Sequence, residues 1–132
     1  MDPHDPHARL HAAALEVLPR AYAPYSNHPV AAAALDDAGT IHTGVNIENA
    51  AYGVTLCAEC SLISSWRMQH GTALTHLVCL NGAGAYITPC GRCRQLLFEH
   101  APYELSIATA NGPVTLHDLL PLAFGPDNLQ ET

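Results

Sequence analysis

Four of the five cysteines lie in two short segments, CAEC at 57–60 and PCGRC at 89–93. Such pairs can form disulfides, a redox dithiol, a structural metal clip or a catalytic metal site. From the order of predicted elements we expect Cys57 to begin one helix and Cys90 and Cys93 to begin another. Helix N-termini lower the pKa of a thiol and favour the thiolate that binds metal. Three thiolates leave the fourth tetrahedral position of Zn²⁺ open to water, which is the catalytic arrangement.

Glu59 lies two residues after Cys57, in the first turn of the expected helix. A carboxylate beside zinc-activated water is a proton shuttle, and zinc deaminases in general combine cysteine ligands with a non-ligand Glu and a P-C-x-x-C segment. A structural site that adds Cys60 as a fourth ligand is the rival interpretation, but it leaves Glu59 unexplained. The fifth cysteine, Cys79 in LVCL, is expected to fill the core.

The composition limits the kinds of partner. The chain has 132 residues, 48% of them hydrophobic, which suits one domain with one core. Its formal net charge is −7, and all five basic residues are arginines, so binding to nucleic acid or to an anionic membrane is not expected. The sequence shows neither a secretory signal nor an apolar stretch of about 20 residues. We therefore expect a cytoplasmic protein with reduced thiols, acting on a small molecule.

The order of predicted elements indicates an α/β layered domain with a mixed sheet. Residues 1–7 are expected to be disordered, and residues 8–132 to form a single domain. Apolar spacing predicts a helix over 8–23 that Pro19 kinks or shortens. The remaining predicted elements are a β-hairpin (30–35 and 40–47), a helix (57–70), a strand (74–80), a helix (91–100), a strand (105–109) and a short helix (115–120).

Five segments of the chain resemble the small homotetrameric cytidine deaminases. They are AYAPYSN (21–27), TGVNIENAAYG (43–53), LCAEC (56–60), TPCGRCRQLL (88–97) and LLPLAFG (119–125). The resemblance implies a three-layer α/β/α fold with a mixed five-stranded sheet. It also implies one Zn²⁺ per subunit on Cys57, Cys90 and Cys93, with Glu59 as the general acid–base. The implied reaction is hydrolytic deamination of cytidine and 2′-deoxycytidine in pyrimidine salvage.

The same resemblance implies how the nucleoside is held. Asn46 and Glu48, which alternate along a strand end, would bind the ribose 3′-hydroxyl, and the backbone of Ala58 would contact the pyrimidine edge. Without the resemblance, Asn46 and Glu48 read as ordinary polar loop residues. The family forms active sites between subunits of a homotetramer, where three residues would reach a neighbour's site: Ala50, Tyr52 and Phe124. The alternative for Phe124 is a core anchor.

The chain departs from the family pattern near its chemistry. Cys60 stands where most members have an arginine that offsets the thiolate charge. Arg92 is our first candidate to supply that charge and Arg94 the second; the alternative for Arg92 is a solvated surface residue. His28 replaces the usual phenylalanine that stacks on the pyrimidine. It predicts weaker cytidine binding or tolerance of a differently substituted base.

Ala32 replaces a usual glycine, which we interpret as a packing adjustment. Two further functions stay open at this point. One is a deaminase of a modified or N4-substituted cytidine or an antibiotic aminopyrimidine nucleoside. The other is a non-catalytic, zinc-stabilised binding module.

Overall fold

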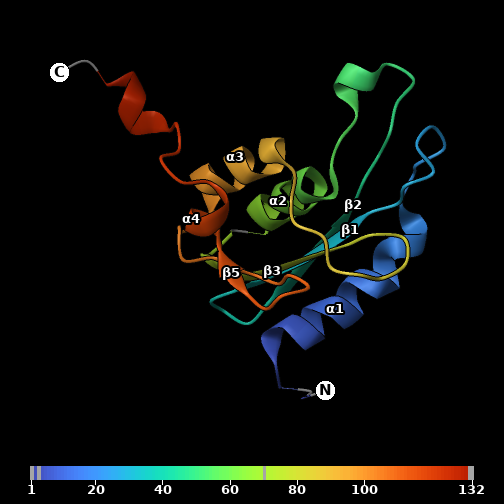
Figure 1. Ribbon diagram of the computed structural model, residues 1–132, viewed down its shortest axis with the longest axis horizontal. Coiled ribbons are helices and arrows are strands. Elements are labelled where there is room, and N and C mark those ends of the chain that lie inside the picture. The colour runs from blue at the N-terminus through green and yellow to red at the C-terminus, as the bar shows by residue number, and fades with distance from the viewer. Residues whose placement is uncertain (1, 3, 70, 131–132) are drawn as a thin grey trace.

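A mixed five-stranded sheet forms the middle layer of the computed structural model, which describes residues 2, 4–69 and 71–130 (Figure 1). The strand order is β2-β1-β3-β4-β5, with β3 and β4 parallel and the other neighbours antiparallel. The strands are β1 (Ala31–Asp36), β2 (Ile41–Val45), β3 (Leu74–Leu80), β4 (Ser106–Ile107) and β5 (Val114–Thr115). The hairpin β1–β2 confirms the pairing predicted around the turn at 36–39.

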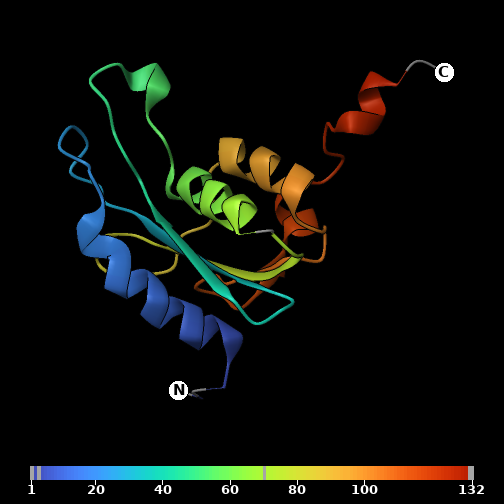
Figure 2. The same ribbon diagram turned by 180° about the vertical axis from the view of Figure 1, so that it is seen from behind.

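Helices cover both faces of this sheet, which confirms the expected α/β/α layering (Figures 1 and 2). Helix α1 (Pro6–Val17) lies against one face, and α2 (Ala58–Met68), α3 (Gly91–His100) and α4 (Leu116–Leu119) lie on the other. Three 3₁₀ turns complete the described elements: η1 (Leu18–Arg20), η2 (Tyr52–Val54) and η3 (Pro126–Leu129). None of the helices in the described part of the chain combines the length and apolarity needed to cross a membrane.

Two helix boundaries differ from the sequence prediction. Helix α1 begins at Pro6 because the Asp5 side chain accepts a hydrogen bond from the His7 N–H at 3.1 Å. Residues 6 and 7, expected to be disordered, are therefore helical, while residues 1 and 3 lie outside the described part. The helix ends at Val17, two residues before Pro19, as the proline predicts. Helix α2 ends at Met68; the predicted end at residue 70 also lies outside the described residues.

Alternation along the strands divides the core into two clusters. One set of residues packs toward α2 and α3: Ala32, Ala34, Leu77 and Cys79. The alternate set packs with Leu10 and Ala14 of α1: Ala31, Ala33, Val78 and Leu80. The small side chains of β1 let helices approach both faces of the sheet closely.

Gly44 of β2 sets the position of α2 over the sheet. A Cβ atom at this residue would collide with the carbonyl oxygen of Ala58 and lie 2.5 Å from the backbone nitrogen of Leu62. Only a residue without a side chain allows this approach. The start of α2, with Cys57 at its N-cap and Glu59 in its first turn, is therefore held directly on β2.

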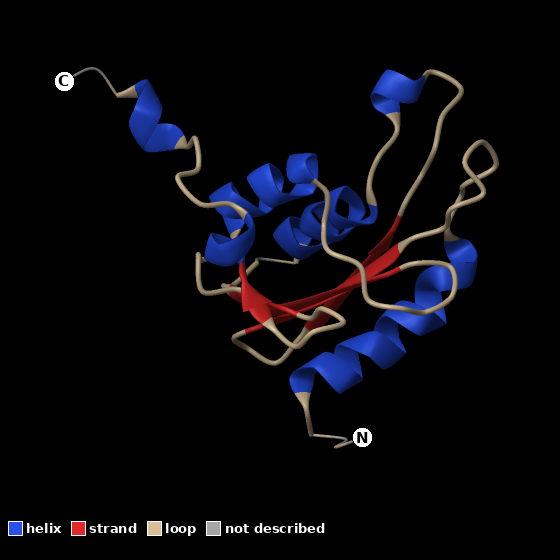
Figure 3. Cartoon of the chain, viewed as in Figure 1, coloured by secondary structure: helices blue, strands red, loops and turns tan. Residues whose placement is uncertain are grey.

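Two segments project from the layered body, as the cartoon shows (Figure 3). One is the connection between β2 and α2, which includes η2 at its tip. The other follows α4 and carries η3 toward the C-terminus. Both are loop-rich segments at the side of the sheet where α2 and α3 lie, and both carry residues that are expected from the sequence at a substrate site.

Candidate active site

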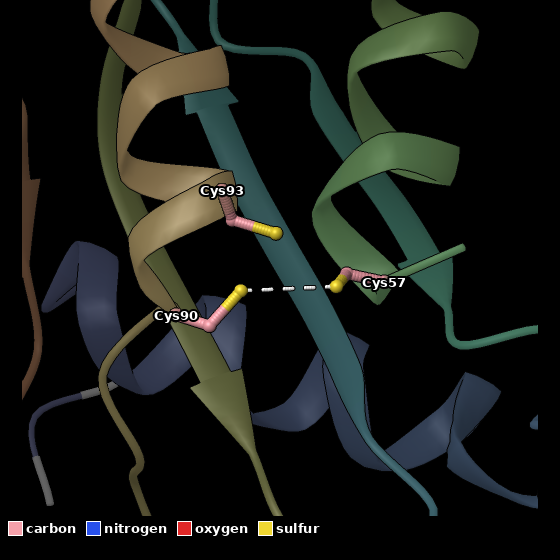
Figure 4. Close-up of side chains that lie close together, drawn as sticks. All are labelled: Cys57, Cys90 and Cys93. Atoms are coloured by element: carbon pink, nitrogen blue, oxygen red, sulfur yellow. Dashed lines mark hydrogen bonds between the residues drawn. The ribbon is translucent and has the colours of Figure 1, made fainter. Parts of the chain in front are cut away.

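Three cysteine side chains from two helix starts converge at one point (Figure 4). Cys57 is the N-cap residue of α2, Cys90 is the N-cap residue of α3, and Cys93 lies in the first turn of α3. Their Sγ atoms all lie within 4.8 Å of one another, and those of Cys57 and Cys90 are 3.8 Å apart. The convergence predicted from the two motifs is confirmed.

The geometry of this cluster fits zinc. A Zn–S distance of about 2.3 Å at a tetrahedral angle places two sulfurs roughly 3.8 Å apart. Among the described residues, the group of potential ligand atoms consists of Cys57, Cys90 and Cys93, and it does not include Cys60. Cys60 belongs to α2, as expected for a residue further along the helix. A three-cysteine set leaves one coordination position open, so the site has the catalytic rather than the closed structural arrangement.

The three thiols differ in their tendency to ionise. Burial, the main cause, raises the pKa of Cys57, and burial together with the charge of Glu59 raises the pKa of Cys93 far above its usual range. Burial also opposes ionisation of Cys90, but hydrogen bonds from Cys93 and Cys57 outweigh it and lower the pKa of that thiol. The expected lowering at helix N-termini therefore holds for Cys90 alone. The other two become thiolates when a cation compensates their charge.

Glu59 is buried beside this cluster, with 4% of its surface exposed. Its Oε1 atom accepts a hydrogen bond from the Sγ of Cys79, 2.8 Å away. Burial and the neighbouring carboxylate raise the pKa of the Cys79 thiol well above its usual range. Cys79 is a core residue, as predicted, but its contact with Glu59 was missed. The strand alternation that puts Cys79 on the α2 side of β3 is the sequence signal that points toward it.

A cavity of about 250 Å³ opens onto the cluster. Its lining includes residues expected from the sequence to bind the substrate or take part in the chemistry: His28, Asn46, Cys57, Ala58, Glu59 and Cys90. A second cavity of about 350 Å³ is lined in part by Glu48 and Tyr52. Thr55 lines both cavities, so the two hollows adjoin at this residue.

Asn46 and Glu48 both hold the loop that carries His28. Asn46 is buried; its Oδ1 accepts from the Val30 N–H at 3.0 Å and its Nδ2 donates to the His28 carbonyl at 3.1 Å. Glu48 accepts from the hydroxyl of Ser26 and from the N–H groups of Tyr25 (3.0 Å) and Ser26 (3.1 Å). The Ser26 hydroxyl is the main cause that lowers the pKa of Glu48.

Three residues expected at a neighbouring subunit's site lie on the projecting segments. Ala50 and Tyr52 are exposed on the β2–α2 connection, Tyr52 by 77%. Phe124 is 59% exposed after α4, where its carbonyl accepts from Gln95 Nε2 at 2.7 Å. This exposure rules out the core-anchor interpretation of Phe124. Neither Ala50 nor Phe124 lines the cavity beside the cysteines within its own chain.

The two arginines near the cluster bind backbone and hydroxyl oxygens. Arg92 donates from Nη1 to the Thr55 carbonyl at 3.0 Å. Arg94 donates from Nε to the Pro89 carbonyl at 2.7 Å, from Nη1 to the Leu119 carbonyl at 3.0 Å, and from Nη2 to Thr88 Oγ1 at 3.2 Å. Arg94 thus fixes the loop that enters Cys90. The proposed compensation of thiolate charge by either residue stays a prediction.

The sequence matches one protein family over residues 4–109: the cytidine and deoxycytidylate deaminase zinc-binding region. The matched span contains Glu59 and all three cysteines of the cluster. The chain belongs to this family. The family match and the cysteine cluster together confirm two expectations: the α/β deaminase fold and a zinc-binding region with three cysteines.

Individual members of the deaminase family cover most of the chain. The cytidine deaminase of Mycobacterium tuberculosis is 50% identical over 109 residues, which span 83% of this chain and 82% of the relative. That of Sporosarcina psychrophila is 36% identical over 115 residues, or 83% of this chain and 85% of the relative. The fold is similar to the crystal structure of cytidine deaminase from M. tuberculosis, with a TM-score of 0.87 and 46% identity over 90% of this chain and 97% of that chain. It is also similar to the crystal structure of cytidine deaminase from Mycobacterium leprae, with a TM-score of 0.85 and 48% identity over 87% of this chain and 97% of that chain.

Proposed function

We propose that the protein is a zinc-dependent hydrolase that deaminates cytidine and 2′-deoxycytidine to uridine and 2′-deoxyuridine, with release of ammonia. The observation that carries this proposal is the placement of a buried carboxylate, Glu59, beside a three-thiol cluster that opens onto a cavity of about 250 Å³. Relatives that share half of its aligned sequence are cytidine deaminases.

Cys57, Cys90 and Cys93 would hold the zinc ion, which, when bound, supplies a Lewis acid that lowers the pKa of water. Glu59 accepts a proton from the attacking water and delivers it to ring nitrogen N3. A bond then forms between the water oxygen and C4 of the base. Glu59 then takes the proton of the new C4 hydroxyl and transfers it to the exocyclic amino group. The bond between C4 and this exocyclic nitrogen breaks, ammonia leaves, and the C4 carbonyl of uridine forms. The burial of Glu59 keeps bulk water away from these proton transfers.

The charge around the cavities favours a nucleoside over a nucleotide. Glu48 presents a carboxylate at the adjoining hollow, and the chain as a whole carries a formal net charge of −7. A 5′-phosphate would be repelled by both. We propose that the enzyme acts in pyrimidine salvage in the cytoplasm, a compartment in which its five free cysteines would stay reduced. Much higher kcat/KM for deoxycytidine than for its 5′-monophosphate is the expected result; the reverse order would overturn the assignment.

A second candidate function rests on His28, which lines the cavity and stands where related deaminases usually have phenylalanine. An imidazole offers a ring nitrogen to a polar base substituent, so a modified or N4-substituted cytidine is the alternative substrate class. Ammonia or amine release measured over a panel of such nucleosides separates the two. Rapid turnover of cytidine itself favours the first candidate.

We further propose a homotetramer in which neighbouring chains complete each site. The supporting observation is that apolar side chains on the two projecting segments stay exposed in the single chain. They are Tyr52 (77%), Val54 (61%), Leu122 (99%) and Phe124 (59%). Apolar surface of this kind is typical of an interface. Light scattering should give the mass of a tetramer. The double variant Tyr52→Ala, Phe124→Ala should lower both the fraction of tetramer and the deaminase activity. A fully active monomer would exclude shared sites.

The direct test of the proposed function compares ammonia release from cytidine by the wild type, Glu59→Gln and Glu99→Gln. Glu99 is exposed near the end of α3 and provides a matched control for the same substitution. Loss of about 10³-fold or more in kcat is expected for Glu59→Gln alone, because general acid–base catalysis is removed while the shape stays. Equal ligand binding and no turnover in all three proteins would instead support a binding module.

A further inference from the structure

Cys79 is a buried thiol that touches the proposed acid–base residue. It lies on β3, with its side chain in the core cluster that also contains Ala58 and Leu62 of α2. Its Sγ–H donates to Oε1 of Glu59 at 2.8 Å. Cys79 is fully buried and Glu59 is 4% exposed, so this hydrogen bond forms away from bulk water.

We propose that Cys79 is a positioning residue for the reaction. Its thiol fixes one carboxylate oxygen of Glu59 and leaves the second oxygen, Oε2, for proton transfer. The inference rests on the proposed role of Glu59, and it assigns Cys79 no direct contact with the substrate or the metal.

The backbone of Cys79 is held more rigidly than that of a loop residue. It pairs with Ala32 of β1, and its carbonyl accepts a hydrogen bond from the Ile87 N–H at 2.9 Å. Glu59 reaches the site on a flexible side chain with three rotatable bonds. A donor fixed on a central strand removes part of that freedom, and a base held in one position transfers protons faster.

Cys93 cannot replace Cys79 in this task. Its side chain lies close to the same carboxylate. As a member of the three-cysteine cluster it is a thiolate when the site holds zinc, and a thiolate has no proton to donate. Cys79 lies outside the cluster and keeps its proton, so it provides the thiol donor to Glu59.

The kinetic test uses Cys79→Ala, Cys79→Ser and Val78→Ala in the full chain. Val78 is the adjacent buried residue of β3, packed in the opposite cluster against α1, and its truncation controls for loss of core volume. Cys79→Ala should lower kcat about fivefold, the effect of one weak hydrogen bond to a charged group, with KM within about twofold of the wild type and zinc content unchanged. Cys79→Ser keeps a donor and should recover most of kcat.

Two kinetic outcomes would overturn the proposal. One is a kcat for Cys79→Ala equal to that of Val78→Ala at equal thermal stability. The other is a Cys79→Ser variant as slow as Cys79→Ala although it folds and binds zinc. Either result would mean that Cys79 acts only by filling the core.

A second readout does not depend on turnover. In zinc-loaded protein with Cys60→Ser, the cluster cysteines are thiolates and Cys79 carries the remaining S–H bond. Its infrared S–H stretch should shift to higher frequency when Glu59→Gln replaces the carboxylate by a weaker amide acceptor. An unshifted band would contradict the contact itself. Full activity of Glu59→Gln would instead refute the proposed function, so the two failures are distinguishable.

Discussion

The Sγ atoms of Cys57 and Cys90 lie 3.8 Å apart, although the two residues are 33 positions apart in the chain. Each is the N-cap residue of a helix, and both helices cover the same face of the sheet. The close approach of α2 to β2 at Gly44 fixes one of these helix starts. Arg94 fixes the loop that leads to the other. The metal centre is thus a product of the layer packing as much as of the motifs.

Removal of one cluster thiol should abolish zinc binding, whereas removal of Cys60 should not. Cys90→Ser loses a thiolate ligand, so zinc per chain should fall from one to near zero after dialysis against a weak chelator. Cys60→Ser changes a cysteine outside the cluster and is the matched control. Metal content by elemental analysis checks both variants, and loss of zinc from Cys60→Ser would restore the four-cysteine interpretation.

Replacement of His28 by phenylalanine should strengthen cytidine binding. His28 is exposed at the wall of the cavity, where a larger apolar ring stacks on a pyrimidine more favourably than imidazole does. We expect KM for cytidine to fall by roughly three- to tenfold, about 1 kcal/mol, with kcat little changed. Steady-state kinetics on cytidine and one N4-substituted cytidine measure the effect. Unchanged values for both substrates would show that His28 does not determine substrate specificity.

Gly44→Ala should destabilise the protein strongly. The added methyl group collides with the Ala58 carbonyl and must push α2 away from β2. Overpacking of this kind costs about 1–3 kcal/mol, and here it also displaces Cys57 and Glu59. Gly53→Ala is the matched control, because a Cβ atom there meets nothing within 4 Å. Urea unfolding should separate the variants, and equal midpoints would contradict the described contact between α2 and β2.

Asp36 and His42 should make stability depend on pH in the acid range. Burial works against the charge of Asp36, but the hydrogen bond from His42 at 2.9 Å and those from the Thr40 and Ala38 N–H groups outweigh it and lower the pKa. A pKa that is lower in the folded state stabilises the fold above the ordinary value of 3.8. That contribution is lost as the pH falls through the folded-state pKa.

Asp36→Asn measures this contribution. The variant should lose about 2 kcal/mol of unfolding free energy at neutral pH, and the difference from wild type should shrink below pH 3.8. Asp37→Asn, at the adjacent exposed residue, should leave both values unchanged. Denaturant unfolding across the acid range tests the sign. A gap between wild type and Asp36→Asn that stays constant with pH would show that the charge of Asp36 does not matter.

Much of the fold follows from local sequence signals. Apolar runs predict β1 and β3, alternation predicts β2, and helix-length segments predict α2 and α3, all within a few residues, because these elements are long enough to show a pattern. The two-residue strand β5 is too short to show a period, and the strand predicted over 105–109 shrinks to two residues. Asp5 and Pro6 carry a helix-start signal of their own, which the His- and Pro-rich composition around them obscured.

The metal centre was predictable because residue chemistry and helix starts are local properties. The contacts around it were not. Cys79 reaches Glu59, and Arg94 reaches Leu119, only after three layers have packed. Whether Asn46 and Glu48 brace a loop or face solvent likewise depends on the path of residues 25–30. Sequence patterns give the direction of a side chain, whereas its partner depends on tertiary packing.

Zinc titration of the metal-depleted protein, with ammonia release from cytidine measured at each step, tests most directly whether the three-cysteine cluster is a catalytic centre. If the cluster is a catalytic zinc centre, the rate should rise in proportion to bound zinc and reach its plateau at one zinc per chain. Bound zinc at that ratio without ammonia release would contradict a catalytic centre and leave a structural metal site.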